Sequence, residues 1–212
     1  GALSVTQIEI MPQPPVGQFF MLECTGIKDG KYIITDLNGD GEISDDDRTY
    51  VGDAQPDLTF GWQNNFTWKN WDFSFFFRGT IGNKVLNNPR AAYANNTYLI
   101  GTNALDDELT YTMKESSRVC SYYLENGSFI RLDNLALGYT FDTKKINWLD
   151  KARLYFAAQN LFVITGYKGL DPEVELFRGE SSDTDAGLSP GIEPRQFFPK
   201  ARTFTLGVNL TF

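Results

Sequence analysis

The sequence has 212 residues and contains no histidine. Without an imidazole, Ser-His-Asp and Cys-His catalysis are excluded, and so is every zinc site that needs a histidine ligand. The two cysteines, Cys24 and Cys120, lie far apart in the sequence and do not have a metal-binding spacing. They are either a disulfide pair or two unrelated thiols, and we favour the second interpretation.

Long apolar runs and excess positive charge are also missing. No run of 18 apolar residues exists, which excludes a spanning helix but not a spanning strand. The net charge is −8. Nucleic acid is therefore not an expected partner, because phosphate binding needs a basic face. No signal peptide precedes Gly1, so we expect a chain that was processed or cut from a longer one.

Aromatic residues, in contrast, are abundant: they make up 15% of the chain, with 17 Phe and 10 Tyr. This is a high fraction for a soluble protein and is usual for membrane barrels with aromatic girdles. The length is sufficient for one sizeable all-β domain.

The clearest strand is the last one, residues 202–212. Large apolar side chains occupy every second position and small polar residues lie between them, which is the period of a β-strand. The apolar positions are Phe204, Leu206, Val208, Leu210 and Phe212. A tilted strand of about 9–11 residues can cross a bilayer. The apolar face could be the core of a soluble sandwich or the lipid-facing side of a barrel.

A hairpin is predicted at residues 58–77, with residues 69–70 as a two-residue turn. This turn pairs Trp68 with Trp71 and Trp62 with Phe77, so the large aromatics share one face. Such a face would crowd a sandwich core. Three tryptophans around one turn suit a membrane interface better.

The remaining segments alternate short and long connections. Further strands are predicted at 129–141 and 152–163, with a less regular one at 16–24 and a short helix near 104–116. The short connections are 69–70 and 142–150, and the long ones are 25–57, 82–128 and 165–200. Outer-membrane barrels have this asymmetry, with short periplasmic turns and long external loops.

Residues 36–47 fit a twelve-residue calcium loop without the flanking helices of an EF-hand. Oxygen ligands fall at the expected positions, and Gly41 permits the sharp turn. The predicted ligands are Asp36, Asn38, Asp40, the Glu42 carbonyl and Asp47. Asp47 replaces the usual closing glutamate. The alternative is a solvated acidic turn; we favour a structural Ca²⁺ ion.

Several segments together resemble the C-terminal region of SusC/RagA-type TonB-dependent outer-membrane transporters of Bacteroidetes. They follow the family's order across nearly the whole chain. The matching segments are 36–41, 61–64, 127–132, 159–162, 169–173 and 202–212. The chain departs from the pattern where Gly191-Ile192-Glu193 replaces the usual Gly-Ile-Asp and where residues 16–32 are compressed.

The resemblance implies an all-β fold of antiparallel up-and-down strands, forming the C-terminal part of a large transmembrane β-barrel in the bacterial outer membrane. Residues 1–212 would be this portion of the barrel, with the loop 36–47 external and the plug domain absent. Five strands and a sixth at 16–24 are too few to close a barrel.

The implied function is nutrient import and not catalysis. The substrate would be an oligosaccharide or a peptide. The partners would be a SusD-like surface lipoprotein and, through the missing N-terminal part, the TonB complex, with outer-membrane lipid around the barrel. Tyr93, Tyr98 and Tyr167 are candidates to stack on substrate, although loop tyrosines are more often solvated.

Two other hypotheses are open. A soluble, calcium-stabilised β-sandwich that binds carbohydrate explains the acidic loop and the aromatics, but not the alternating loop lengths. A glycosidase could use Asp171 with Glu173, or the run 106–108, as paired carboxylates. We rank the enzyme last, because nothing in the sequence orders two carboxylates across a cleft.

Overall fold

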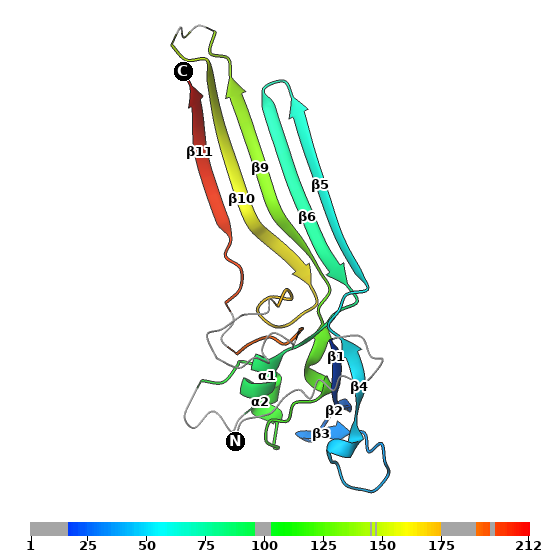
Figure 1. Ribbon diagram of the computed structural model, residues 1–212. Helices are drawn as coiled ribbons and strands as arrows, with labels where there is room; N and C mark the ends of the chain where they lie inside the picture. Colours follow the sequence, from blue (N-terminus) through cyan, green and yellow to red (C-terminus); the bar gives the residue numbers. More distant parts are fainter. Residues whose placement is uncertain (1–16, 96–102, 145, 147, 175–189, 196–197) are drawn as a thin grey trace, which may run out of the picture. The chain divides into compact units, whose positions relative to one another are not determined.

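The computed structural model describes residues 17–95, 103–144, 146, 148–174, 190–195 and 198–212 (Figure 1). These residues form two compact units. We call residues 58–81, 129–165 and 199–212 the sheet unit, and the described parts of 1–57, 82–128 and 166–198 the loop unit. No helix among the described residues is long and apolar enough to cross a membrane.

The sheet unit is one antiparallel sheet of five strands in the order β11-β10-β9-β6-β5 (Figure 1). The strands are β5 (Leu58–Trp68), β6 (Trp71–Ile81), β9 (Phe129–Phe141), β10 (Lys151–Thr165) and β11 (Thr203–Thr211). Each strand of this sheet pairs with the strand of the sheet that comes next along the chain, as in an up-and-down sheet. The predicted strands 58–77, 129–141, 152–163 and 202–212 are confirmed.

The register of the β5–β6 hairpin is the predicted one. Trp68 lies opposite Trp71 and Trp62 opposite Phe77. Lys69, the first turn residue, has a positive φ of 56°, which suits a tight hairpin turn. The Trp62 and Phe77 rings stack with their centroids 6.0 Å apart. The aromatic side chains therefore gather on one face of the hairpin.

This apolar face continues across the sheet and is exposed. Trp62 is 58% exposed, Phe66 54% and Leu206 73%. A soluble sandwich would bury such a face against a second sheet. The sandwich hypothesis is therefore wrong for this sheet, and the exposed apolar strip has the character of a lipid-facing surface.

The opposite face is polar and is held by an ion pair that spans three strands. Arg153 of β10 donates its Nε hydrogen to Asp72 Oδ1 of β6 at 2.9 Å. Gly138 of β9 lies between them, and a Cβ there would fall 2.4 Å from the arginine Nη2. Glycine at 138 therefore makes room for the ion pair.

The sheet is open. Among the described residues, β5 and β11 each pair with one neighbour and form the two edges. An open edge carries unpaired backbone donors and acceptors, which a membrane does not tolerate.

The loop unit contains three small two-stranded sheets and short helices, of which the sequence predicted only a strand at 16–24 and a helix near 104–116. The sheets pair β1 (Gln18–Leu22) with β4 (Arg48–Asp53), β2 (Cys24–Lys28) with β3 (Lys31–Ile34), and β7 (Lys84–Leu86) with β8 (Leu124–Asn126). The helices are η1 (Asp45–Asp47), α1 (Asn88–Tyr93), α2 (Glu108–Thr112) and η3 (Ser121–Tyr123).

Two expectations about these segments were wrong. The strand expected at 16–24 exists as β1, but it pairs with β4 and does not join the five-stranded sheet. The connections 25–57 and 82–128 are not merely long loops, because they share a core. Its buried residues include Phe19 and Met21 of β1 and Leu86, Leu109, Met113, Cys120 and Tyr123 of the second connection, and Ile27, Ile34 and Val51 of the first connection pack against them. Strands of three to six residues show too little alternation to be recognised from sequence.

Candidate functional site

The acidic loop between β3 and β4 is organised by its own side chains. Asp36 accepts hydrogen bonds from the N–H of Gly39 at 2.7 Å and of Gly41 at 2.9 Å. Asp40 accepts from the N–H of Glu42 at 2.8 Å. Gly39 and Gly41 both have positive φ, which glycine adopts without strain. The loop thus turns around carboxylates that face its backbone.

Asp47 closes this loop and is fully buried. Its carboxylate accepts from the N–H groups of Leu37 at 2.9 Å and Ser44 at 2.8 Å. These bonds, the one from Ser44 first, lower the pKa of Asp47 below its ordinary value, because they stabilise the charged form. Asp47 therefore fastens both ends of the loop.

The donor set suits a hard cation, since Asp36, Asn38, Asp40 and Asp47 offer only oxygen ligands of the kind that Ca²⁺ prefers. In the described part of the chain, however, no three acidic, cysteine or histidine side chains are grouped closely enough to hold a metal ion. The backbone hydrogen bonds engage the same oxygens. The calcium site, including the Glu42 carbonyl, stays a prediction.

The three tyrosines proposed as substrate contacts have different surroundings. Tyr93 lies at the end of α1, half-buried, with the Arg195 guanidinium 5.9 Å from its ring centroid. Tyr167 is only 6% exposed, so its ring does not present a surface for stacking. Tyr98 lies outside the described residues.

Tyr167 instead belongs to a buried latch with Glu193. Its hydroxyl donates to Glu193 Oε2, and the other carboxylate oxygen accepts from the Leu170 N–H at 3.0 Å. A Cβ at Gly169 would lie 2.2 Å from Glu193 Oε2. Burial is the main reason that the pKa of Glu193 is raised. The latch joins Tyr167 and the start of segment 169–173 to segment 191–193.

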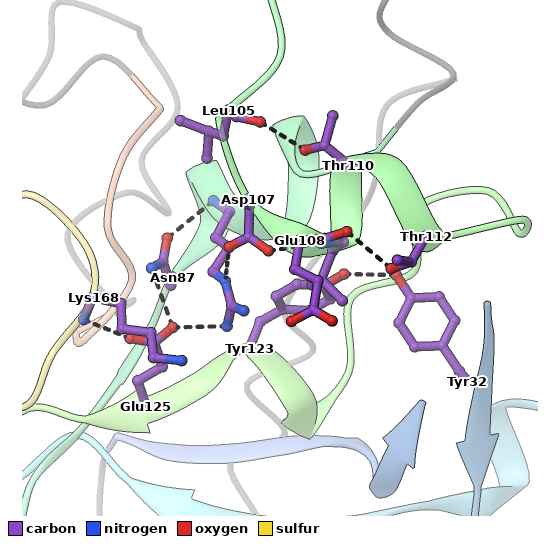
Figure 2. A network of polar contacts seen from close by, with 12 residues as sticks. Tyr32, Asn87, Leu105, Asp107, Glu108, Thr110, Thr112, Tyr123, Glu125 and Lys168 are labelled. Atoms are coloured by element: carbon purple, nitrogen blue, oxygen red, sulfur yellow. Dashed lines mark hydrogen bonds and ion pairs between the residues drawn. The ribbon is translucent and has the colours of Figure 1, made fainter. Parts of the chain in front are cut away.

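Two of the carboxylates considered for catalysis, Asp107 and Asp171, have structural partners. Asp107 caps α2 by accepting from the Leu109 N–H at 2.9 Å, and it pairs with Arg90 at 2.7 Å (Figure 2). Burial by itself would raise the pKa of Asp107, but the bonds from Arg90 and Leu109 outweigh it, so the pKa is lowered. Arg90 also contacts Glu125 at 3.3 Å. Asp171 is buried and accepts from the Glu173 N–H.

A groove of about 760 Å³ in the loop unit was not foreseen from the sequence. It is lined by Phe20, Met21, Leu22, Ile43, Ser44, Asp45, Arg48 and residues 114–119. The lining combines apolar side chains with both signs of charge. Only tertiary folding brings β1, the acidic loop and residues 114–119 together, so no local sequence signal could have indicated it.

The chain is similar to known proteins in both sequence and structure. No protein-family model matches the chain. TonB-dependent receptor P3 of Formosa agariphila is 36% identical over 197 residues, which cover 86% of this chain and 19% of the relative. TonB-dependent receptor SusC of Bacteroides thetaiotaomicron is 29% identical over 211 residues, covering 92% and 19%.

Among solved structures, the RagAB peptide transporter superposes with a TM-score of 0.68 at 24% identity, over 94% of this chain and 24% of that one. The chain spans about a fifth of the length of the curated relatives that it matches. The two relatives are named as TonB-dependent receptors, and the solved structure is described as a peptide transporter. Over the stretch that it covers, this chain belongs to the SusC/RagA-type TonB-dependent receptors, which are outer-membrane proteins of Gram-negative Bacteroidetes.

Proposed function

We propose that this chain is part of a TonB-dependent importer that takes up oligosaccharides or peptides through the outer membrane. The observation that carries the proposal is the 36% identity to a TonB-dependent receptor over 86% of the chain. The exposed apolar face of the five-stranded sheet supports it, because that face suits lipid and not water.

The proposed partners are a SusD-like surface lipoprotein on the outside and the TonB complex, which would act through parts of the protein beyond this chain. The loop unit supports the first of these. It has its own buried core, so it can present a defined surface to a lid and to substrate, unlike a set of unstructured loops.

The groove beside the acidic loop is the proposed contact surface for substrate. Arg48 lines it with a side chain that is 24% exposed and that pairs with Asp45 at 2.8 Å. Phe20 and Leu22 supply apolar area in the same groove. Mixed charge next to apolar surface suits a peptide, whereas an oligosaccharide would use the hydrogen-bonding groups.

Growth of a strain lacking the intact receptor gene tests the import function. We expect the deletion strain to stop growing either on glycan or on protein, and to grow on it again when the wild-type gene is returned. The polymer on which growth is lost identifies the class of substrate. Unchanged growth and uptake on both classes after deletion would contradict the proposal.

A groove variant makes the test specific. Arg48→Glu should reduce uptake of labelled substrate while leaving receptor levels in the outer membrane unchanged. Lys144→Glu is the control, since Lys144 is exposed in the short β9–β10 connection and outside the groove. Equal uptake by the two variants would exclude the groove as the contact surface.

The calcium ion is proposed as a structural cofactor of this unit. Bound between Asp36, Asn38, Asp40 and Asp47, it would screen the repulsion among three carboxylates and stiffen the loop beside the groove. Its role would be to hold the loop in shape, with no part in transport chemistry.

A further inference from the structure

The two cysteines, 96 positions apart in the sequence, meet in the loop unit. Cys24 begins β2, and Cys120 directly precedes η3. The backbone N–H of Cys24 donates to Ser121 Oγ at 2.8 Å, and that hydroxyl donates in turn to the Cys24 carbonyl at 3.4 Å. This pair of bonds fastens the start of β2 to the residue after Cys120.

The side chains are close as well as the backbones. Both cysteines are free thiols. Cys24 packs against the buried core that contains Cys120, and the neighbouring Cys24 thiol helps to raise the pKa of the Cys120 thiol, after burial, which is the main cause. The Cys24 thiol also lies 3.2 Å from the Gly26 carbonyl oxygen, to which it donates. Cys120 is fully buried in the core, whereas Cys24 is half-buried. Cys24 is therefore the more exposed residue of the pair.

We propose that Cys24 and Cys120 are joined by a disulfide in the mature outer-membrane protein. Cysteines whose backbones are held together inside one folded unit, as Cys24 and Cys120 are through Ser121, need little backbone movement to form a bond. Proteins of the outer membrane mature through a compartment in which disulfides form and persist. The proposal rests on the location of the protein and is independent of what it imports.

The reaction is a thiol–disulfide exchange with an oxidised protein dithiol oxidoreductase. The Cys24 thiolate attacks one sulfur of the oxidoreductase disulfide, forming a mixed disulfide and releasing the other sulfur as a thiolate. The Cys120 sulfur, after loss of its proton, then attacks Cys24 Sγ and expels the second oxidoreductase thiolate. The two electrons and two protons of the receptor thiols end on the oxidoreductase, which leaves as a dithiol.

The order of the two steps follows from burial. Burial raises the pKa of the Cys120 thiol to about 12, so this thiol is a poor first nucleophile at neutral pH. In the mixed disulfide it is already next to the sulfur that it must attack. Cys24 is thus the entry thiol and Cys120 the resolving thiol.

The disulfide would tie the loop unit together across a long stretch of chain. It would connect β2 to the segment at η3, which otherwise meet through the two Ser121 hydrogen bonds and side-chain packing. Closing so long a loop restricts the unfolded chain strongly. The oxidised receptor should accordingly unfold at a higher temperature than the reduced one.

Peptide mapping of the intact receptor tests the bond directly. Cells are quenched in acid, free thiols are alkylated, and the receptor from outer membranes is digested with trypsin without reductant. We expect the peptide Val119–Arg131 to appear mainly linked to the peptide that ends at Lys28, and to be released by reductant. If both cysteines are found alkylated in most molecules, the proposal is wrong.

Two variants serve as controls. Cys24→Ser and Cys120→Ser should each abolish the linked species and leave the remaining cysteine fully alkylated. A linked peptide that appears only after purified, reduced receptor is treated with oxidised glutathione would show that the thiols can pair but do not pair in cells, which also overturns the proposal.

Discussion

At the scale of single residues, the acidic loop depends on Asp47 more than on any other side chain. Asp47 is the buried carboxylate, and it accepts from backbone N–H groups on both sides of the loop. Exposed neighbours such as Asp46 have no comparable role. The sequence indicated Asp47 only as the last ligand of a metal loop, so its structural role is a finding of the fold.

Asp47→Asn should loosen this loop. The amide keeps one acceptor oxygen but loses the charge and the second acceptor, so the N–H of Leu37 or of Ser44 loses its partner. Hydrogen exchange of the peptide covering residues 36–47, measured by mass spectrometry at pH 7, should become faster. Asp46→Asn is the matched control and should exchange like wild type; equal protection in both variants would contradict this role.

The same carboxylate predicts acid sensitivity of the loop. The pKa of Asp47 is lower in the folded protein than its ordinary value of 3.8, so its stabilising contribution is fully present above that value. The contribution falls as pH drops below 3.8 and is lost once pH passes the folded pKa. Proteolysis within the loop should increase over this acidic window in wild type and change less in Asp47→Asn.

Calcium binding is tested at the same scale by Asp40→Ala. If residues 36–47 hold the ion, removing the ligand at the fifth loop position should abolish the heat of calcium binding in calorimetry. Asp46→Ala, which removes a charge but no predicted ligand, should bind like wild type. If the wild-type protein gave no heat of calcium binding, the loop would be held by its own hydrogen bonds and not by metal.

At the scale of elements, the five-stranded sheet has two faces of opposite character. β6 illustrates this: Phe75 lies on the apolar face next to Trp62, at 5.0 Å between ring centroids, while Ser74 lines a recess on the polar face with Gln63. Alternation along each strand determines which side chains lie on each face, and the confirmed register of the β5–β6 hairpin places the apolar side chains of both strands on the same face.

Phe75→Arg should therefore damage the receptor more than Ser74→Arg. A positive charge on the lipid side near mid-bilayer costs roughly 2–4 kcal/mol, against little on the opposite face. Levels of assembled, heat-modifiable receptor in outer membranes measure this. Greater loss from Ser74→Arg than from Phe75→Arg would mean that the apolar face does not meet lipid.

At the scale of the whole molecule, the sheet is open at β5 and β11. Every backbone group within lipid must be paired, so each edge needs a strand from outside the described chain. The relatives, about five times longer than the matched segment, have ample sequence for such strands.

Expressed alone, this chain should aggregate or pair edge to edge with its own copies. Co-expression with the rest of the intact receptor should restore a heat-modifiable band on a semi-native gel. A monomer of this chain that gives that band alone in detergent would contradict the need for further strands.

The sequence by itself determined the sheet unit. Strands of nine to fifteen residues with strict alternation, such as β11, and a two-residue turn at Lys69 leave one register and one facing, because a shift by one residue would invert every side chain. The sequence also predicted a tight acidic turn at residues 36–47, because its glycines and carboxylates form contacts with residues only two to five positions away.

Only the tertiary structure decided the loop unit. The pairing of β1 with β4, the meeting of Cys24 with Cys120, and the Tyr167–Glu193 latch all join residues far apart in the chain. Short strands carry little periodic signal, and a buried glutamate looks like any acidic loop residue until its partner is known. These contacts arise from packing around a shared core, which no local pattern encodes.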